Sequence, residues 1–92
     1  MTAKLRFFAR FRELLGTDIL VPVREGVTIS DLVRSAVSGN EGGYAAIFDE
    51  NGNFREFVIL MRNGKRIERQ DTKNTPVQDG DEIAIFPPVA GG

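Results

Sequence analysis

The residues of this sequence that could take part in chemistry are concentrated at positions 87–92, which read Pro-Pro-Val-Ala-Gly-Gly. Pro87 and Pro88 cannot donate to a sheet ladder, so the chain is expected to leave the preceding strand in an extended form. Gly91 and Gly92 place no Cβ near the terminal carboxylate, so a narrow channel of another protein could enclose this backbone. A carboxylate becomes an acyl donor once it is activated, typically by adenylation. We therefore expect the carboxyl group of Gly92, taken as the natural end, to be the reactive group.

Residues 89–92 are expected to form a flexible tail on a domain made of residues 1–88. An extended tail of four residues reaches about 13 Å, at about 3.3 Å per residue. That length lets Val89, Ala90 and the two glycines enter a partner's pocket while the domain stays outside. The alternative is a disordered terminus without a function, since disorder concentrates at chain ends. The glycine pair, the double proline and the preceding strand together favour function.

The sequence contains no cysteine and no histidine. The first absence excludes a disulfide, a thiolate metal site and an iron–sulfur cluster. The second removes the most usual general base and metal ligand. Gly64 and Lys65 lack the earlier glycine and the following Ser or Thr of a phosphate-binding loop. We therefore expect no metal and no bound cofactor, and we expect any ATP that activates Gly92 to be used by a partner enzyme.

Composition indicates one globular domain, with 41% hydrophobic and 27% charged residues among 92. The net charge of −1 gives no general attraction to nucleic acid or to an anionic membrane. There is no apolar run of about 20 residues and no signal peptide, so a cytoplasmic location is expected. Arginines near Phe7 and Phe11 could suggest an RNA-stacking surface. Because these phenylalanines are needed for a core, we favour a solvated arginine face and no nucleic-acid partner.

Two segments resemble the sulfur-carrier family with a ubiquitin-like fold. They are FFARFRELLG at 7–16 and DGDEIAIFPPVAGG at 79–92. That family includes the small subunit of molybdopterin synthase, the thiamine-pathway sulfur carrier and the archaeal small modifiers that are similar to ubiquitin. The resemblance spans essentially the whole chain. The long middle, residues 40–55, and the segment ILMRNG at 59–64 look more like the archaeal branch.

The resemblance implies a function in two stages. An activating enzyme similar to that of ubiquitin adenylates Gly92, and a sulfur donor converts the acyl-adenylate to a thiocarboxylate. The tail then delivers its sulfur to a precursor of molybdopterin on the large subunit of molybdopterin synthase. The resemblance does not distinguish a molybdenum cofactor from a tungsten cofactor as the final product. The same activated carboxyl group could instead be joined to lysines of target proteins, making the chain a modifier. A third possibility is a non-covalent interaction module, which would keep its function without Gly91 and Gly92.

Hydrophobic periodicity predicts an alternation of strands and helices. The first half is predicted to contain a strand at 4–8, a short helix at 10–15, an edge strand at 18–23 and a main helix from the N-cap Thr28 to Gly39. A flexible join at 41–43 and a brief helical turn at 44–48 are expected to follow. The second half is predicted to contain a central strand at 57–62, a hairpin at Asn63-Gly64 that returns through 65–68, an irregular stretch at 71–76 and a final strand at 82–86. This order fits the α+β class. It agrees with the β-grasp (ubiquitin-like) fold that the family implies, a mixed sheet of four to five strands with one main helix across one face.

If the first and last strands are neighbours, strand alternation turns Phe8 and Phe86 away from the helix. Two exposed phenylalanines beside the root of the tail would form an apolar patch of the kind that marks a partner site. The resemblance implies that Phe8 and Phe86 pack on the activating enzyme and on the synthase partner, and that Arg12 makes polar contacts there. The alternative is that loops of the chain cover both rings. The predicted partner-binding residues are Phe8, Arg12, Phe86, Pro87, Pro88, Val89, Ala90 and Gly91.

Overall fold

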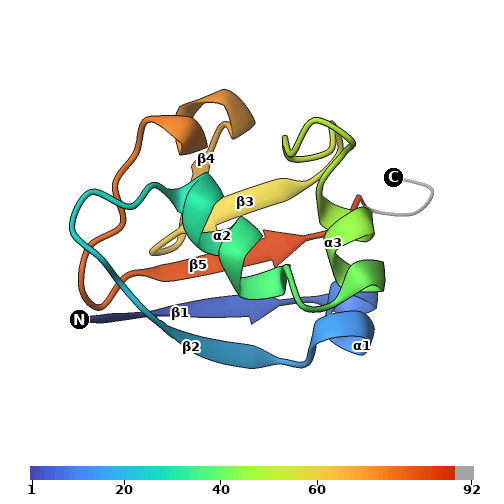
Figure 1. The fold of residues 1–92 in the computed structure, drawn as a ribbon, viewed down its shortest axis with the longest axis horizontal. Coiled ribbons are helices and arrows are strands. Elements are labelled where there is room, and N and C mark those ends of the chain that lie inside the picture. The colour runs from blue at the N-terminus through green and yellow to red at the C-terminus, as the bar shows by residue number, and fades with distance from the viewer. Residues whose placement is uncertain (89–92) are drawn as a thin grey trace.

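The computed structural model describes residues 1–88, so the predicted tail at 89–92 lies outside the described residues. Within residues 1–88 the chain forms a five-stranded mixed sheet with the strand order β2-β1-β5-β3-β4 (Figure 1). The strands are β1 Thr2–Phe7, β2 Asp18–Pro22, β3 Ile59–Arg62, β4 Lys65–Ile67 and β5 Glu82–Phe86. The helices are α1 Ala9–Leu15, α2 Ile29–Val37, α3 Glu41–Ile47 and the short 3-10 helix η1 Arg69–Lys73. Helix α2 lies across one face of the sheet (Figure 1), which is the β-grasp arrangement that the sequence predicted.

Strand β5 occupies the centre of the sheet, between β1 on one side and β3 on the other. It runs parallel to β1, with Leu5 opposite Ile83 and Phe7 opposite Ile85, and antiparallel to β3. These four side chains are fully buried, because alternate residues of both strands point to the face that the helix covers. The last strand is therefore held by backbone hydrogen bonds on both sides, and the point where it ends is fixed in the sheet.

Helix α2 begins where the sequence predicted. The Thr28 hydroxyl accepts a hydrogen bond from the backbone N–H of Asp31 at 3.3 Å, which satisfies a donor that the helix itself cannot pair. The buried face contains Ile29, Leu32, Val33 and Val37, at the spacing of one helical stripe. Helix α2 ends at Val37, with Ser38 as its C-cap, two residues before Gly39. This stripe closes the core over the central strands.

The hairpin between β3 and β4 is also as predicted. Asn63 and Gly64 have φ angles of 50° and 84°, the pair of left-handed residues that a two-residue turn of type I′ needs. Strand β2 lies at the edge of the sheet, where the missing N–H of Pro22 costs no ladder hydrogen bond. No helix in the part of the chain that the structure describes has the length and apolar character needed to cross a membrane.

Three parts of the fold differ from the sequence prediction. Residues 41–43 are the first turn of α3 and not a flexible join, because the Asn40 side chain accepts a hydrogen bond from the Gly43 N–H at 2.8 Å. Residues 69–73 form η1, where the prediction had an irregular stretch from 71. The predicted strand at 57–62 begins only at Ile59, so Phe57 precedes the sheet.

Candidate functional site

The aromatic rings of Phe8 and Phe86 stack at the ends of β1 and β5. Their centroids lie 4.3 Å apart and their planes differ by 10°. The backbone N–H of Phe8 donates to the carbonyl oxygen of Ile85 at 3.3 Å, which extends the β1–β5 pairing to the start of α1. The structure thus brings these two predicted site residues together. It corrects the prediction that both are exposed, since each ring is half-buried with one face against the other.

Two arginines lie beside the Phe8 ring. The guanidinium carbons of Arg6 and Arg12 are 5.4 Å and 5.5 Å from the ring centroid, within the range of a cation–π contact. Arg12 is held there by a hydrogen bond of 3.3 Å from its Nε to the carbonyl oxygen of Phe7. Arg6 is held by ion pairs with Asp18 at 3.2 Å and Glu82 at 3.9 Å. The predicted site residue Arg12 therefore lies next to the stacked rings and contributes positive charge there.

The stacked rings form one wall of an open groove of about 840 Å³. We call it the aromatic groove and define it by six apolar residues of its lining, which are Phe8, Phe57, Ile59, Met61, Phe86 and Pro87. Arg10 and Arg55 also line it. An apolar floor with cationic side chains around it is typical of a protein-binding surface.

The sequence prediction did not name the groove residues Phe57, Ile59 and Met61 as site residues, and Phe57 is the most exposed of the three. Its side chain is 59% exposed, whereas Val58 and Leu60 are buried at 4% and 1% exposure. Ile59 pairs with Phe86 and Met61 with Ala84 in the register of β3 and β5, so these side chains share the outer face of the sheet. The alternation of 57, 59 and 61 against 58 and 60 is the signal that could have identified Phe57.

The root of the predicted tail lies in this groove. Pro87 and Pro88 both line it, directly after the end of β5. The remaining predicted site residues, Val89, Ala90, Gly91 and Gly92, lie outside the described residues. The groove and the start of the tail are therefore parts of one surface, and the segment that leads to the expected reactive group begins at that surface.

Asp81 fixes the other end of β5. The Asp81 side chain is 8% exposed, and its carboxylate accepts hydrogen bonds from the Gln78 N–H at 2.8 Å, from Asn63 at 2.9 Å and from Arg62 at 3.1 Å. Burial acts to raise the pKa of Asp81, but these hydrogen bonds and the Arg62 charge together outweigh it and lower the pKa below its ordinary value. The ionised carboxylate therefore joins the β3–β4 hairpin to the start of β5.

Within residues 1–88 no group of three or more histidine, cysteine, aspartate or glutamate side chains is arranged to hold a metal ion. The groove itself contains aromatic, aliphatic and arginine side chains but no carboxylate.

The ThiS family matches residues 5–92 of this sequence. The chain belongs to this family. The match confirms the sulfur-carrier resemblance that the two end segments predicted. Relatives of this chain include a sulfur carrier subunit and a small archaeal modifier protein, and this chain has the β-grasp fold of SAMP1.

Relatives of both kinds align along the chain. Small archaeal modifier protein 3 of Haloferax volcanii is 38% identical over 93 residues, which cover 100% of both chains. The molybdopterin synthase sulfur carrier subunit of Aedes aegypti is 39% identical over 88 residues, covering 96% of this chain and 86% of the relative. Among solved structures, SAMP1 from Haloferax volcanii has a TM-score of 0.85 and 26% identity, with both chains covered completely.

Proposed function

We propose that this protein is a sulfur carrier for molybdopterin synthesis and that it carries sulfur as a thiocarboxylate at Gly92. The observation on which the proposal rests is the position of the aromatic groove at the root of the tail. Strand β5 ends in the groove at Phe86, and Pro87 and Pro88 continue along it. A partner that covers the groove therefore receives the tail at the same time. The protein itself would act by positioning, because the acid and base groups come from the partner.

Two partners follow from this proposal. The first is an adenylating enzyme similar to the ubiquitin-activating enzyme, which binds and uses the ATP. The second is the large subunit of molybdopterin synthase, where the sulfur is delivered. Support for the second comes from the Aedes aegypti relative, whose name describes a subunit of that synthase. Phe8, Phe86 and Arg12 would contact both partners in turn, because both must reach the same tail.

The proposed chemistry needs no oxidant or reductant. A carboxylate oxygen of Gly92 attacks the α-phosphorus of ATP, and pyrophosphate leaves. A donor at the oxidation level of hydrosulfide then attacks the acyl carbon, and AMP leaves with the electrons of the broken C–O bond. Loss of a proton gives the thiocarboxylate. On the synthase its sulfur bonds to a carbon of the precursor as an oxygen leaving group departs, and water cleaves the resulting thioester to restore the Gly92 carboxylate.

A second candidate function is attachment to other proteins through Gly92. The full-length similarity to small archaeal modifier protein 3 favours it. Both functions share the acyl-adenylate, and they diverge only in the nucleophile, which is sulfur in one case and a lysine amine in the other. The groove serves equally well in both, because the activating enzyme must bind it in either case.

Mass spectrometry of the protein from its native cell tests both functions. A thiocarboxylate raises the intact mass by the difference between a sulfur and an oxygen atom. Conjugation leaves a Gly-Gly remnant on lysines of other proteins after digestion. A variant lacking Gly91 and Gly92 should lose both signals. If neither signal is found, and the shortened variant still complements a deletion strain, the covalent functions are wrong and a non-covalent binding module remains.

A further inference from the structure

The charged side chains that line the aromatic groove are all arginines. Arg10 and Arg55 are among its lining residues, and Arg12 lies beside the Phe8 ring. Within residues 1–88 none of these three arginines is in an ion pair. The whole sequence has a net charge of −1, so the excess of positive charge belongs to this surface and not to the chain in general.

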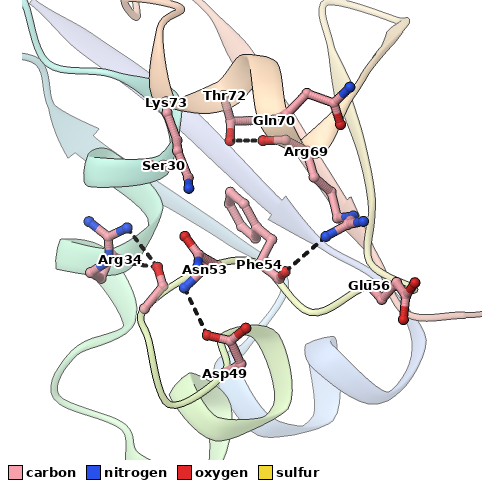
Figure 2. Close-up of a pocket in the computed structure, with 11 residues that line it drawn as sticks. Ser30, Arg34, Asp49, Asn53, Phe54, Glu56, Arg69, Gln70, Thr72 and Lys73 are labelled. Atoms are coloured by element: carbon pink, nitrogen blue, oxygen red, sulfur yellow. Dashed lines mark hydrogen bonds between the residues drawn. The ribbon is translucent and has the colours of Figure 1, made fainter.

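Carboxylates elsewhere in the described residues do not line the groove. Asp18 and Glu82 are paired with Arg6, at 3.2 and 3.9 Å. Glu56 lines another cavity, the one drawn in Figure 2, which shares no lining residue with the groove. Glu13 of α1 is also absent from the groove lining. The groove therefore combines apolar surface with positive charge that no carboxylate within it neutralises.

Arg55 is held at the groove by helix α3. Its backbone N–H donates to the carbonyl oxygen of Ile47 at 2.8 Å, and its Nε donates to the carbonyl oxygen of Ala45 at 2.6 Å. The last turn of a helix leaves carbonyl oxygens without partners inside the helix, and Arg55 pairs with two of them. The fold thus fixes this guanidinium group at the groove without an ion pair to balance its charge.

Arg10 is brought to the groove by a sharp turn of the chain at Ala9. This alanine has a φ angle of 51°, in the left-handed region that residues with a Cβ rarely adopt. The Phe8 N–H still pairs with Ile85 in the sheet, while the Phe8 carbonyl oxygen accepts from the Phe11 N–H in α1 at 3.1 Å. Strained backbone of this kind concentrates at functional sites. Here the turn places Arg10 in the groove lining and Phe11 in the core.

The ring of Phe8 is poorly suited to stacking with nucleic-acid bases. One face lies against Phe86, and the guanidinium carbons of Arg6 and Arg12 lie over the ring at 5.4 and 5.5 Å from its centroid. Proteins that bind single-stranded nucleic acid stack bases on free aromatic faces. A protein segment with apolar side chains needs no free ring face, so it fits this surface better than a nucleic acid does.

We propose that the partner segment that occupies the aromatic groove presents apolar side chains flanked by carboxylates, which pair with Arg10, Arg12 and Arg55. The apolar lining accommodates the apolar side chains, and the arginines attract the acidic residues on either side of them. Complementary charge of this kind determines the register of binding and speeds encounter. This partner chemistry goes beyond the proposed function but rests on it, because it takes the groove as the partner site.

Two matched peptides added to the full-length chain test the charge of the partner. One short synthetic peptide has leucines flanked by aspartates, and the other has asparagines in place of the aspartates. Each is titrated into ¹⁵N-labelled protein, and the amide signals of Phe57, Ile59 and Met61 are followed by NMR. We expect the acidic peptide to shift these signals saturably and to bind at least about fivefold more tightly than the asparagine peptide. Raising sodium chloride from about 50 mM to about 500 mM should remove most of this difference, because salt screens exposed charges.

Variants show whether the groove arginines cause the preference. Arg10→Gln and Arg55→Gln should each weaken binding of the acidic peptide about two- to threefold, the effect of losing one exposed ion pair, and should leave binding of the asparagine peptide unchanged. Arg24→Gln is the matched control, because Arg24 is exposed and lies after β2, outside the groove lining. It is likewise in no ion pair within residues 1–88. Spectra of the free variants show whether the fold is kept.

Several results would overturn the proposal. They are equal affinity for the two peptides, no saturable shift with either, and equal losses in Arg24→Gln and Arg10→Gln. Tighter binding of a single-stranded oligouridine at the same amides would also overturn it, in favour of a nucleic-acid surface. None of these results decides the proposed function, which is tested by the mass of the product at Gly92. A preference for the acidic peptide without that mass change would leave a module that binds acidic partners non-covalently.

Discussion

The rings of Phe8 and Phe86 lie face to face, 4.3 Å apart, at the ends of two parallel neighbouring strands. This stack joins the start of α1 to the last residue of β5, directly before Pro87. The surface that we assign to partner binding therefore includes the end of the central strand β5, from which the root of the tail continues. A partner that binds the rings would hold the root of the tail, Pro87 and Pro88, in a fixed position relative to its own active site.

Phe57 offers a clean test of the aromatic groove. Because its side chain is 59% exposed, Phe57→Ser removes apolar surface from the groove and little from the core. We expect the free energy of unfolding to change by less than about 0.5 kcal/mol, as is usual for surface substitutions. Binding to the adenylating enzyme, measured by isothermal titration calorimetry, should weaken about tenfold or more, as for an aromatic residue inside an interface.

Leu20→Ser is the matched control for Phe57→Ser. Leu20 is 69% exposed but lies on β2, at the sheet edge and away from the groove lining. Its substitution should change neither stability nor partner binding. If Leu20→Ser weakens binding as strongly as Phe57→Ser does, the loss reflects general surface hydrophobicity and the groove is not the binding site.

Substitution of Phe8 should affect stability as well as binding. The ring is half-buried against Phe86, so Phe8→Ala loses both buried area and a stacked pair worth about 0.5–1.5 kcal/mol. A double-mutant cycle with Phe86→Ala, followed by chemical denaturation, measures this coupling. A coupling energy of zero would show that the two rings do not stabilise each other in solution.

Much of this surface could be predicted from the sequence because strand alternation is local. The spacing of Leu5, Phe7 and Phe8 determines which face of β1 each side chain reaches, and the same holds for Ile85 and Phe86. Two aromatic residues that point to the same face of the sheet at neighbouring positions of adjacent strands must then contact each other. The local pattern did not predict how far each ring is exposed. Each ring covers part of the other, and this mutual cover depends on which strands are neighbours in the sheet.

The segment between α2 and β3 could not be predicted in the same way. Two adjacent glycines, Gly42 and Gly43, indicate a flexible join by propensity. The structure instead places them in the first turn of α3, where the Asn40 side chain caps Gly43 and also donates to the Leu14 carbonyl oxygen at 2.8 Å. That second bond joins residues 26 positions apart, so no local pattern contains it. The position of α3 therefore depends on a tertiary contact with the end of α1.

Stability should decrease in acid because of Asp81. Its pKa is lower in the folded protein than in an unfolded chain, so the unfolded state binds more protons as the pH falls toward and below about 4. The stabilisation by the ionised carboxylate is therefore fully present above that range and is lost as the pH falls through the folded pKa. Urea denaturation between pH 7 and pH 3 measures the effect.

Asp81→Asn tests the source of this acid sensitivity. The amide cannot pair with the Arg62 charge, so we expect a loss of about 1–3 kcal/mol at pH 7 and a flatter dependence of stability on pH. Asp18→Asn is the control, because Asp18 forms an exposed ion pair with Arg6 at 41% side-chain exposure, and such pairs contribute little. If Asp18→Asn reduces the loss of stability in acid while Asp81→Asn does not, the assignment to Asp81 is wrong.

The two glycines of α3 should respond to alanine in opposite directions. A Cβ on Gly43 would lie 2.7 Å from Cγ of Leu15, so α3 approaches α1 closely at this point. A Cβ on Gly42 would have its nearest neighbours at 3.7 and 3.8 Å, which is ordinary contact. Gly42→Ala should therefore stabilise by up to about 1 kcal/mol through helix propensity, whereas Gly43→Ala should destabilise because Leu15 must move out of its packing. Thermal unfolding followed by circular dichroism compares the two, and a Gly43→Ala variant as stable as Gly42→Ala would mean that the α1–α3 contact is looser than described.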